Sequence, residues 1–385
     1  MKLLPVILFS LTQLAWGVEG TVSSKVQATQ TIPNVASVSR SPFPVSGVNI
    51  NMYGTNLLLR DTTDYIQSLN NLVSTGSNTV LVTTPYVQET GTSSSVFADP
   101  NITETDANLA TVFDALKARG FTVAYKFTLL PSDGSWSGEV RPTDASAWFA
   151  SYKAHLVRLA ALSQAHGVTI LYIANEMQSM ASSSYAMQWN DVLDGVRAVY
   201  SGKLSWNAVM NTNGTPNGEA FNIPVLSRLD HIGLSFYQPL TNKANPTVAE
   251  VVQSWYGNNQ GNNLVAAVKA LHNATDKPIV FSELSYRSVA GNNINPSAWQ
   301  ATPTDVFSSQ EQANCYDGFM QVWKNERQAW MLGVLWWQWR IESNPPRWWS
   351  VDQSPQNLEA QTVMTRWFTS VKPVKLTPIL MLLLD

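Results

Sequence analysis

Two glutamates, Glu176 and Glu283, each follow a short apolar run and have the residue type and placement to do chemistry. Glu176 ends the stretch VTILYIANE, directly after Asn175, and Glu283 ends the stretch KPIVFSE. Two carboxyl groups that flank one glycosidic bond can hydrolyse it, because one protonates the leaving oxygen while the other attacks or activates water. Each glutamate alone also has a structural explanation, as a helix N-cap or as a salt-bridged loop residue.

Aromatic residues follow two further apolar runs. Tyr237 comes after the run DHIGLSF, where its phenol could hydrogen-bond a nucleophilic carboxylate and keep it ionised. The run LGVLWWQW holds three tryptophans, and strand alternation sends Trp337 and Trp339 to one face and Trp336 to the other. A core role for Tyr237 and barrel filling by the tryptophans remain open as alternatives.

Composition narrows the class of partner. The 385 residues include 24 basic and 27 acidic side chains, and the net charge of −3 argues against a nucleic-acid or anionic-membrane partner. The aromatic content is high, with 15 Trp, and indole rings in excess of a core's needs stack well on the apolar faces of sugar rings. A polysaccharide or oligosaccharide substrate fits this composition, and we expect the protein to be a monomer.

The sequence predicts no metal and no cofactor. Cys315 is the one cysteine, so neither an intramolecular disulfide nor a thiolate metal site is possible. The four histidines show no ligand spacing, and neither GxGxxG nor GxxxxGK[ST] occurs. We therefore expect chemistry that depends on side chains alone.

The two ends of the chain differ from its middle. Residues 1–17 combine an early Lys2, an apolar run and small residues, the pattern of a secretory signal peptide that is too short to span a membrane. Residues 18–42 are polar and aperiodic, so we interpret them as a flexible linker. A catalytic domain is expected over 43–372, followed by an apolar tail of unknown role over 373–385. The protein is thus predicted to be secreted.

Short apolar runs alternate with helical patterns through the middle of the chain. Most runs are β-branched or aromatic and apolar on both faces, which is typical of strands in a parallel sheet. The eight runs begin at Gly47, Asn78, Phe121, Val168, Lys203, Asp230, Lys277 and Leu332. Apolar stripes at helical spacing begin near Tyr65, Leu109, Trp148, Trp189 and Leu264, and further helices are expected over 310–331 and 355–370.

Eight strands, most of them followed by a helix, predict an α/β fold with a single (β/α)8 TIM barrel. A doubly wound open sheet is the alternative, but it usually has fewer strands and, for nucleotides, a glycine-rich first turn. In a barrel the carboxyl ends of the strands build the active site. Glu176 and Glu283 would then face each other across the same mouth.

The chain resembles glycoside hydrolase family 113 from about Ser46 to Ser370. The segments that carry the resemblance are WSGEVRPTDASAWFASY from Trp136, IANEMQS from Ile173, VRAVYSGKLSW from Val196, LDHIGLSFYQPL from Leu229, KPIVFSELSYRS from Lys277, GVLWWQW from Gly333 and SPQN from Ser354. The resemblance implies an endo-β-1,4-mannanase of a retaining clan with (β/α)8 barrels. It assigns the acid/base to Glu176, the nucleophile to Glu283, sugar 2-hydroxyl binding to Asn175, and the tyrosine beside the nucleophile to Tyr237.

Trp136, Trp337 and Lys126 complete the predicted substrate-binding set. Three features depart from the family pattern. Ser235 stands where an Asp is expected, and KFTLLPSDG keeps only Lys126 of the run expected after the third strand. The fifth strand ends in Val209 and Met210 in place of an Asn-Trp-like pair. Another β-glycanase, an exo-β-mannosidase and a non-catalytic carbohydrate-binding barrel are the alternative functions.

Overall fold

The computed structural model describes residues 34–35, 39–52, 62–210, 218–298, 300–326, 328–342 and 352–369. All of these residues belong to one compact unit, Pro33–Asp385. The expected signal peptide 1–17, most of the expected linker 18–42 and the apolar tail 373–385 lie outside the described residues. Within the described ranges, no helix combines the length and the apolar character needed to cross a membrane.

The described end of the expected linker packs against the folded unit. Val35 is only 3% exposed, and its N–H donates to the Arg119 carbonyl at 2.8 Å. The Arg40 N–H donates to the Phe368 carbonyl at 2.6 Å. The folded unit therefore begins before residue 43, where the sequence placed the start of the catalytic domain.

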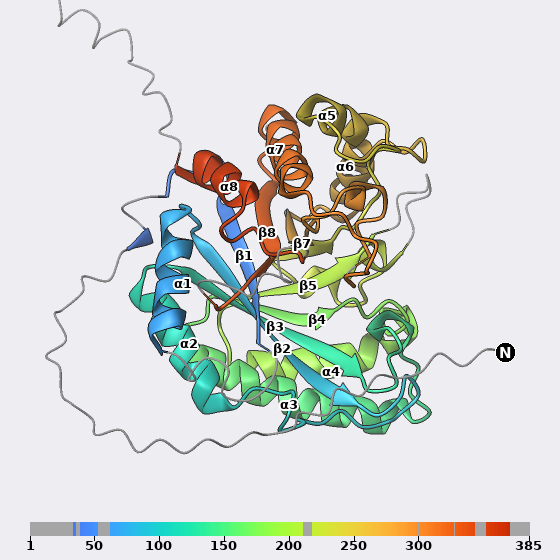
Figure 1. Ribbon diagram of the computed structural model, residues 1–385. Coiled ribbons are helices and arrows are strands. Elements are labelled where there is room, and N and C mark those ends of the chain that lie inside the picture. The colour runs from blue at the N-terminus through green and yellow to red at the C-terminus, as the bar shows by residue number, and fades with distance from the viewer. Residues whose placement is uncertain are drawn as a thin grey trace, which may run out of the picture. The chain divides into compact units, whose positions relative to one another are not determined.

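Eight parallel strands close into one barrel, which confirms the predicted (β/α)8 fold (Figure 1). Each strand pairs with its neighbour in sequence, and β1 pairs with β8 to close the ring. The strands are β1 (Val45–Asn51), β2 (Thr79–Gln88), β3 (Thr122–Pro131), β4 (Ile170–Asn175), β5 (Lys203–Val209), β6 (His231–Ser235), β7 (Ile279–Leu284) and β8 (Met331–Trp339).

Helices surround the strands, and most lie where apolar stripes predict them. They are α1 (Thr62–Ser74), α2 (Asp106–Ala118), α3 (Ala145–Ala165), α4 (Ala186–Arg197), α5 (Val248–Tyr256), α6 (Leu264–Thr275), α7 (Ser309–Glu326) and α8 (Glu359–Thr369). No helix is predicted over α5, although its start carries a capping box between Thr247 and Glu250. That signal marks a helix start even where the apolar stripe is short.

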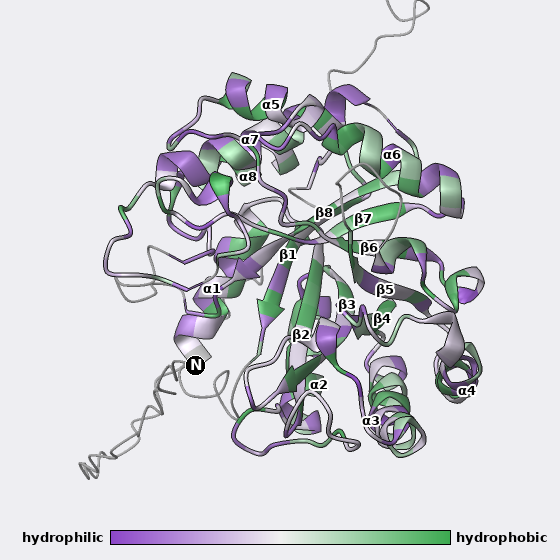
Figure 2. Cartoon of the chain, turned by 90° about the vertical axis from the view of Figure 1, so that its right-hand side faces the viewer, coloured by the Kyte–Doolittle hydropathy of each residue, from purple (hydrophilic) through white to green (hydrophobic). Residues whose placement is uncertain are grey.

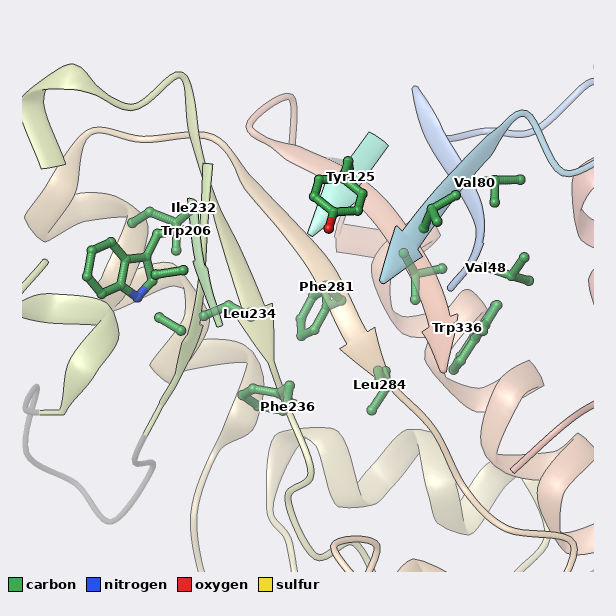
Figure 3. Close-up of a cluster of buried hydrophobic side chains, with 14 of the residues drawn as sticks. Val48, Val80, Tyr125, Trp206, Ile232, Leu234, Phe236, Phe281, Leu284 and Trp336 are labelled. Atoms are coloured by element: carbon green, nitrogen blue, oxygen red, sulfur yellow. The ribbon is translucent and has the colours of Figure 1, made fainter. Parts of the chain in front are cut away.

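The main core lies between the outer face of the strands and the helices. Phe281 on β7 packs against Phe319 and Trp323 of α7, with ring centroids 5.1 and 5.3 Å apart. Trp206 on β5 lies 4.7 Å from Trp189 of α4. Figure 3 shows Trp206, Phe281 and neighbouring side chains of this layer along the strands. Figure 2 shows hydrophobic residues on the strands, whereas the helices also carry hydrophilic residues.

A second, smaller cluster comes from alternate strand positions and fills the barrel interior. It consists of Leu81, Ala124, Ile170, Tyr172, Val280 and Leu335. Alternate residues of a strand point to the same face. Every second residue from these positions toward the carboxyl end of the strand therefore also points into the barrel, up to its mouth. Lys126 is two residues beyond Ala124 on β3 and so points into the same interior.

Candidate active site

Three strands carry one extra residue just where they reach the barrel mouth. Each extra residue is a β-bulge, which bends the strand and re-aims the side chains beside it. At β7 the result is visible in the hydrogen bonds: the neighbouring residues Ser282 and Glu283 both bond to Asn207, so both point inward. The register shifts fall between Tyr172 and Asn175 in β4, between Val280 and Glu283 in β7, and between Trp336 and Trp339 in β8.

Glu283 lies at the end of β7 among three donors. The Lys126 ammonium forms an ion pair with Glu283 Oε2. The Asn207 amide donates to the same oxygen at 3.4 Å, and the Tyr237 hydroxyl donates to Oε1 at 3.2 Å. A cation and two neutral donors stabilise the ionised form of a carboxyl group. Glu283, which is 9% exposed, is thus surrounded by donors at the mouth of the barrel.

Lys126 is fully buried, with none of its side chain exposed. Its ammonium pairs with Glu283 and also lies 5.0 Å from the centroid of the Trp337 ring. The sequence assigned Lys126 to substrate binding, and the observed contacts of its ammonium are with these two side chains. A buried cation beside a buried carboxylate offsets part of the cost of burying both charges.

Tyr237 follows β6 and is half-buried. Burial and the nearby charge of Glu283 hold the pKa of the Tyr237 phenol well above its usual value. The phenol therefore stays protonated near neutral pH and remains a donor to Glu283.

Glu176 occupies the residue after β4 and adopts a left-handed backbone with φ of 51°. Its two carboxyl oxygens have different partners: the Trp136 indole N–H donates to Oε2 at 2.8 Å, and the Ser235 hydroxyl donates to Oε1. Burial, followed by the charge of Glu283, raises the pKa of Glu176, while the donors Ser235 and Trp136 partly oppose that rise. Glu176 is the carboxyl group of the pair that is disposed to keep a proton.

Asn207 links the two ends of the site. Its side-chain amide donates to Asn175 Oδ1 at 2.5 Å as well as to Glu283. Its backbone carbonyl accepts the N–H of Glu176 at 2.8 Å. Asn175, at 8% exposed, is thereby fixed beside Glu176 at the end of β4. The residues predicted from β4, β6 and β7 therefore converge on one hydrogen-bonded group.

Trp136 and Trp337 both reach the site. Trp136 lies in the loop after β3, is 40% exposed and contacts Glu176 through its indole N–H. A Cβ on Gly138 would lie 2.5 Å from its ring, so the indole lies flat on a glycine backbone that leaves it room. Trp337 is half-buried over Lys126.

The predicted alternation of the β8 tryptophans is wrong. Trp336 and Trp339 are both buried on the helix side: Trp336 stacks on Tyr316 of α7 at 3.7 Å, and the Trp339 indole donates to Ser68 of α1 at 3.0 Å. The bulge in β8 inserts one residue between them, and this extra residue lets both face outward. Trp337 alone of the three contacts the site.

Two residues of the site were not predicted from the sequence. Asn207 lies within the fifth apolar run, where an amide gives no periodic signal. The family pattern places an amide two residues later, where this chain has Val209 and Met210. Ser235 was noted only as a departure from the family pattern, yet its hydroxyl contacts Glu176. In the described part of the chain no group of three or more His, Cys, Asp or Glu side chains is arranged to hold a metal.

One known family matches most of this chain. The family model of Glycoside Hydrolase Family 113 matches residues 60–354, a range that includes every site residue described above. The chain belongs to Glycoside Hydrolase Family 113. This GH113 barrel is accordingly a glycoside hydrolase. A comparison with curated proteins gave no match.

Solved structures share the barrel fold. A GH113 β-1,4-mannanase solved as a complex is 19% identical with a TM-score of 0.70, and the match covers 86% of this chain and 99% of that chain. The GH113 β-mannanase AaManA from Alicyclobacillus acidocaldarius, in complex with ManMIm, is 20% identical with a TM-score of 0.69, covering 84% and 96%. A structure of fungal β-1,4-galactanases has a lower TM-score of 0.52 at 17% identity.

Proposed function

We propose that this glycoside hydrolase cleaves β-1,4-mannosidic bonds in mannan or glucomannan by double displacement with retention. The observation that carries the mechanism is the contrast between two carboxyl groups at one barrel mouth. Glu283 pairs with the buried Lys126 ammonium, whereas burial and the neighbouring charge raise the pKa of Glu176. A carboxyl group in contact with a cation suits the role of nucleophile, and a carboxyl group with a raised pKa suits the role of acid.

In the first step the Glu283 carboxylate attacks the anomeric carbon while the bond to the leaving oxygen breaks. Glu176 transfers its proton to that oxygen. Bond formation removes the charge of Glu283, and with it one of the causes that raise the pKa of Glu176. Glu176 is then ionised and accepts a proton from the incoming water, whose oxygen attacks the anomeric carbon and releases Glu283.

Sugar recognition involves the residues around the two glutamates. In this proposal Asn175 binds the 2-hydroxyl of the sugar at the cleavage site, and Trp136 and Trp337 contribute apolar ring faces to the subsites. Mannan as the substrate class is supported by membership of the family and by the neighbouring structures described as β-1,4-mannanases.

A panel of polysaccharides tests the substrate. We expect the purified protein to release reducing sugar from β-mannan and glucomannan and little from xylan, cellulose or laminarin. The reason is that a closed subsite built to bond one pattern of hydroxyls leaves buried polar groups unpaired with another, at a cost of roughly 1–3 kcal/mol for each group. Strong release from xylan or laminarin with none from mannan would contradict the proposed substrate.

The pH dependence tests the role of Glu176. Because the proposed acid must hold its proton in the first step, kcat/KM falls as the pH rises through the pKa of Glu176. The Ser235 hydroxyl favours the ionised form and lowers that pKa. Ser235→Ala should therefore raise the pKa of Glu176 and move the alkaline limb upward by about one to two pH units, since a hydrogen bond to a charged group is worth roughly 1.5–3 kcal/mol.

Ser205→Ala is the matched control, because the buried Ser205 hydroxyl donates to the His231 backbone carbonyl and contacts neither glutamate. We expect its alkaline limb to coincide with that of the unmodified protein. An alkaline limb that stays in place or moves to lower pH in Ser235→Ala would exclude Glu176 as the group that sets it.

We also propose that the protein is exported, from the charge and apolar pattern of residues 1–17. Intact mass measurement of the mature protein from its native host should show an N-terminus between Gly17 and Gly20. Secreted protein that still carries Met1 would contradict removal of this segment.

A further inference from the structure

Glu219 is a buried carboxyl group that the mechanism above does not use. It opens the short 3-10 helix η5 (Glu219–Phe221) and is 1% exposed. Its Oε1 accepts the backbone N–H of Met177 at 2.7 Å and the indole N–H of Trp206 at 2.6 Å. Its Oε2 accepts the backbone N–H of Val209 at 2.9 Å.

These donors come from the two strand ends that build the acid/base half of the site. Met177 directly follows Glu176, and Val209 is the last residue of β5, two residues beyond Asn207. Glu219 thus ties the turn after β4 to the end of β5. The Trp206 indole, fully buried against Trp189 of α4, holds the Glu219 carboxyl in register with both backbones.

The turn that Glu219 holds is a strained one. A residue other than glycine with φ near 51°, as Glu176 has, occupies a sparsely populated region at a cost of roughly 1–3 kcal/mol. Two backbone hydrogen bonds bracket that residue: its own N–H donates to the Asn207 carbonyl, and the next N–H, from Met177, donates to Glu219. The second of these bonds depends on a side chain and is therefore open to substitution.

Burial of this carboxyl group is itself costly. Desolvation raises the pKa of Glu219 to about 8, and the charge of Glu176 adds to the rise. An apolar side chain would avoid this cost, but it would leave three N–H donors without an acceptor. A carboxyl group suits this position because its two oxygens can accept hydrogen bonds both from the turn after β4 and from the end of β5.

We infer that Glu219 is a positioning residue for Glu176, because its acceptance of the Met177 N–H fixes the left-handed turn that presents the Glu176 carboxyl to the glycosidic oxygen. The inference rests on the proposed function, in which Glu176 is the acid/base. It predicts that loss of Glu219 impairs proton transfer to the leaving group more than it impairs attack by Glu283.

The test compares two leaving groups in Glu219→Leu, which keeps a similar volume and removes both acceptors. For a manno-oligosaccharide, whose leaving oxygen needs a proton, kcat/KM should fall about tenfold or more, because general acid catalysis is worth roughly 10²–10⁴-fold. For a dinitrophenyl β-manno-oligosaccharide, whose leaving group departs without a proton, kcat/KM should change little. Glu219→Gln keeps an oxygen toward Met177 and should restore most of the loss.

Glu311→Leu is the matched control. Glu311 is also fully buried and accepts backbone N–H groups of Asn245, Gly291 and Asn293, and its bonded loops follow β6 and β7 instead of β4. Any loss in this variant should be equal for the two substrates. If Glu219→Leu yields no folded protein, Glu219→Asp is used instead, because its shorter side chain moves the carboxyl group away from the Met177 N–H. Its kcat/KM is compared on the same two substrates.

Equal losses on both substrates in the Glu219 variant, or no loss on either, would overturn the inference and leave the proposed function intact. Failure of the proposed function looks different: the unmodified protein would then cleave neither manno-oligosaccharide nor the activated β-mannoside. In that case the same pair of leaving groups on whichever β-glycoside the unmodified protein cleaves gives the comparison for Glu219.

Discussion

Replacing Glu283 by Ala should abolish turnover on every substrate, with a loss of at least about 10⁴-fold in kcat, because the first covalent bond of the mechanism is made by this carboxylate. The loss should not depend on the leaving group, since attack on the anomeric carbon is required for all of them. Steady-state assays on manno-oligosaccharides and on dinitrophenyl glycosides check this expectation.

A stability control separates chemistry from folding. Glu283→Ala also leaves the buried Lys126 ammonium without its counterion, and breaking a buried ion pair costs about 3–5 kcal/mol. Glu283→Gln retains the shape and an acceptor and should be as inactive as the alanine variant while melting closer to the unmodified protein. Turnover by Glu283→Gln within tenfold of the unmodified rate would show that this carboxylate is not the nucleophile.

Replacing Glu176 by Ala should give a loss that depends strongly on the leaving group. With manno-oligosaccharides kcat/KM should fall by roughly 10²–10⁴-fold, which is the usual contribution of a general acid. With a dinitrophenyl glycoside the first step should be spared, and the glycosylated enzyme should accumulate because no base activates water.

Azide then reports the face of attack. An azide ion in the space left by the Glu176 carboxyl should restore turnover and give a β-glycosyl azide, since it attacks the intermediate from the side opposite Glu283. The same ion in Glu283→Ala should give the α-glycosyl azide by direct displacement. The reverse pairing of products, identified by NMR, would mean that the roles of the two glutamates are exchanged.

Much of the fold follows from the sequence because strands buried on both faces leave continuous apolar runs, and eight of these alternate with helical stripes. The same topology explains why Glu176 and Glu283, more than a hundred residues apart, lie at one barrel mouth: each is at the carboxyl end of a parallel strand, and the carboxyl ends of all eight strands share one rim. The position of these two residues in the fold is therefore enough to predict them as site residues, without any detail of side-chain packing.

The rest of the site depends on features that leave no periodic signal. The direction of a strand side chain is predicted from strict alternation, and the bulges in β4, β7 and β8 interrupt that alternation. Trp336 and Trp339 therefore lie on the same face, although strict alternation would place them on opposite faces. Asn207 is an amide inside an apolar run. Glu219 lies in the segment after β5 and bonds the end of that strand. Two of its partners are backbone N–H groups, whose positions are defined only in the folded chain.

The anomeric configuration of the first product distinguishes double displacement from inversion, because retention requires the paired roles of Glu283 and Glu176 together. A defined manno-oligosaccharide is hydrolysed in the NMR tube, and the anomeric proton of the new reducing end is followed before mutarotation equilibrates it. With retention, the β-anomer should form first and decay toward equilibrium. An α-anomer as the first product would establish inversion, in which Glu283 acts on water and no glycosyl-enzyme forms, and would contradict the mechanism.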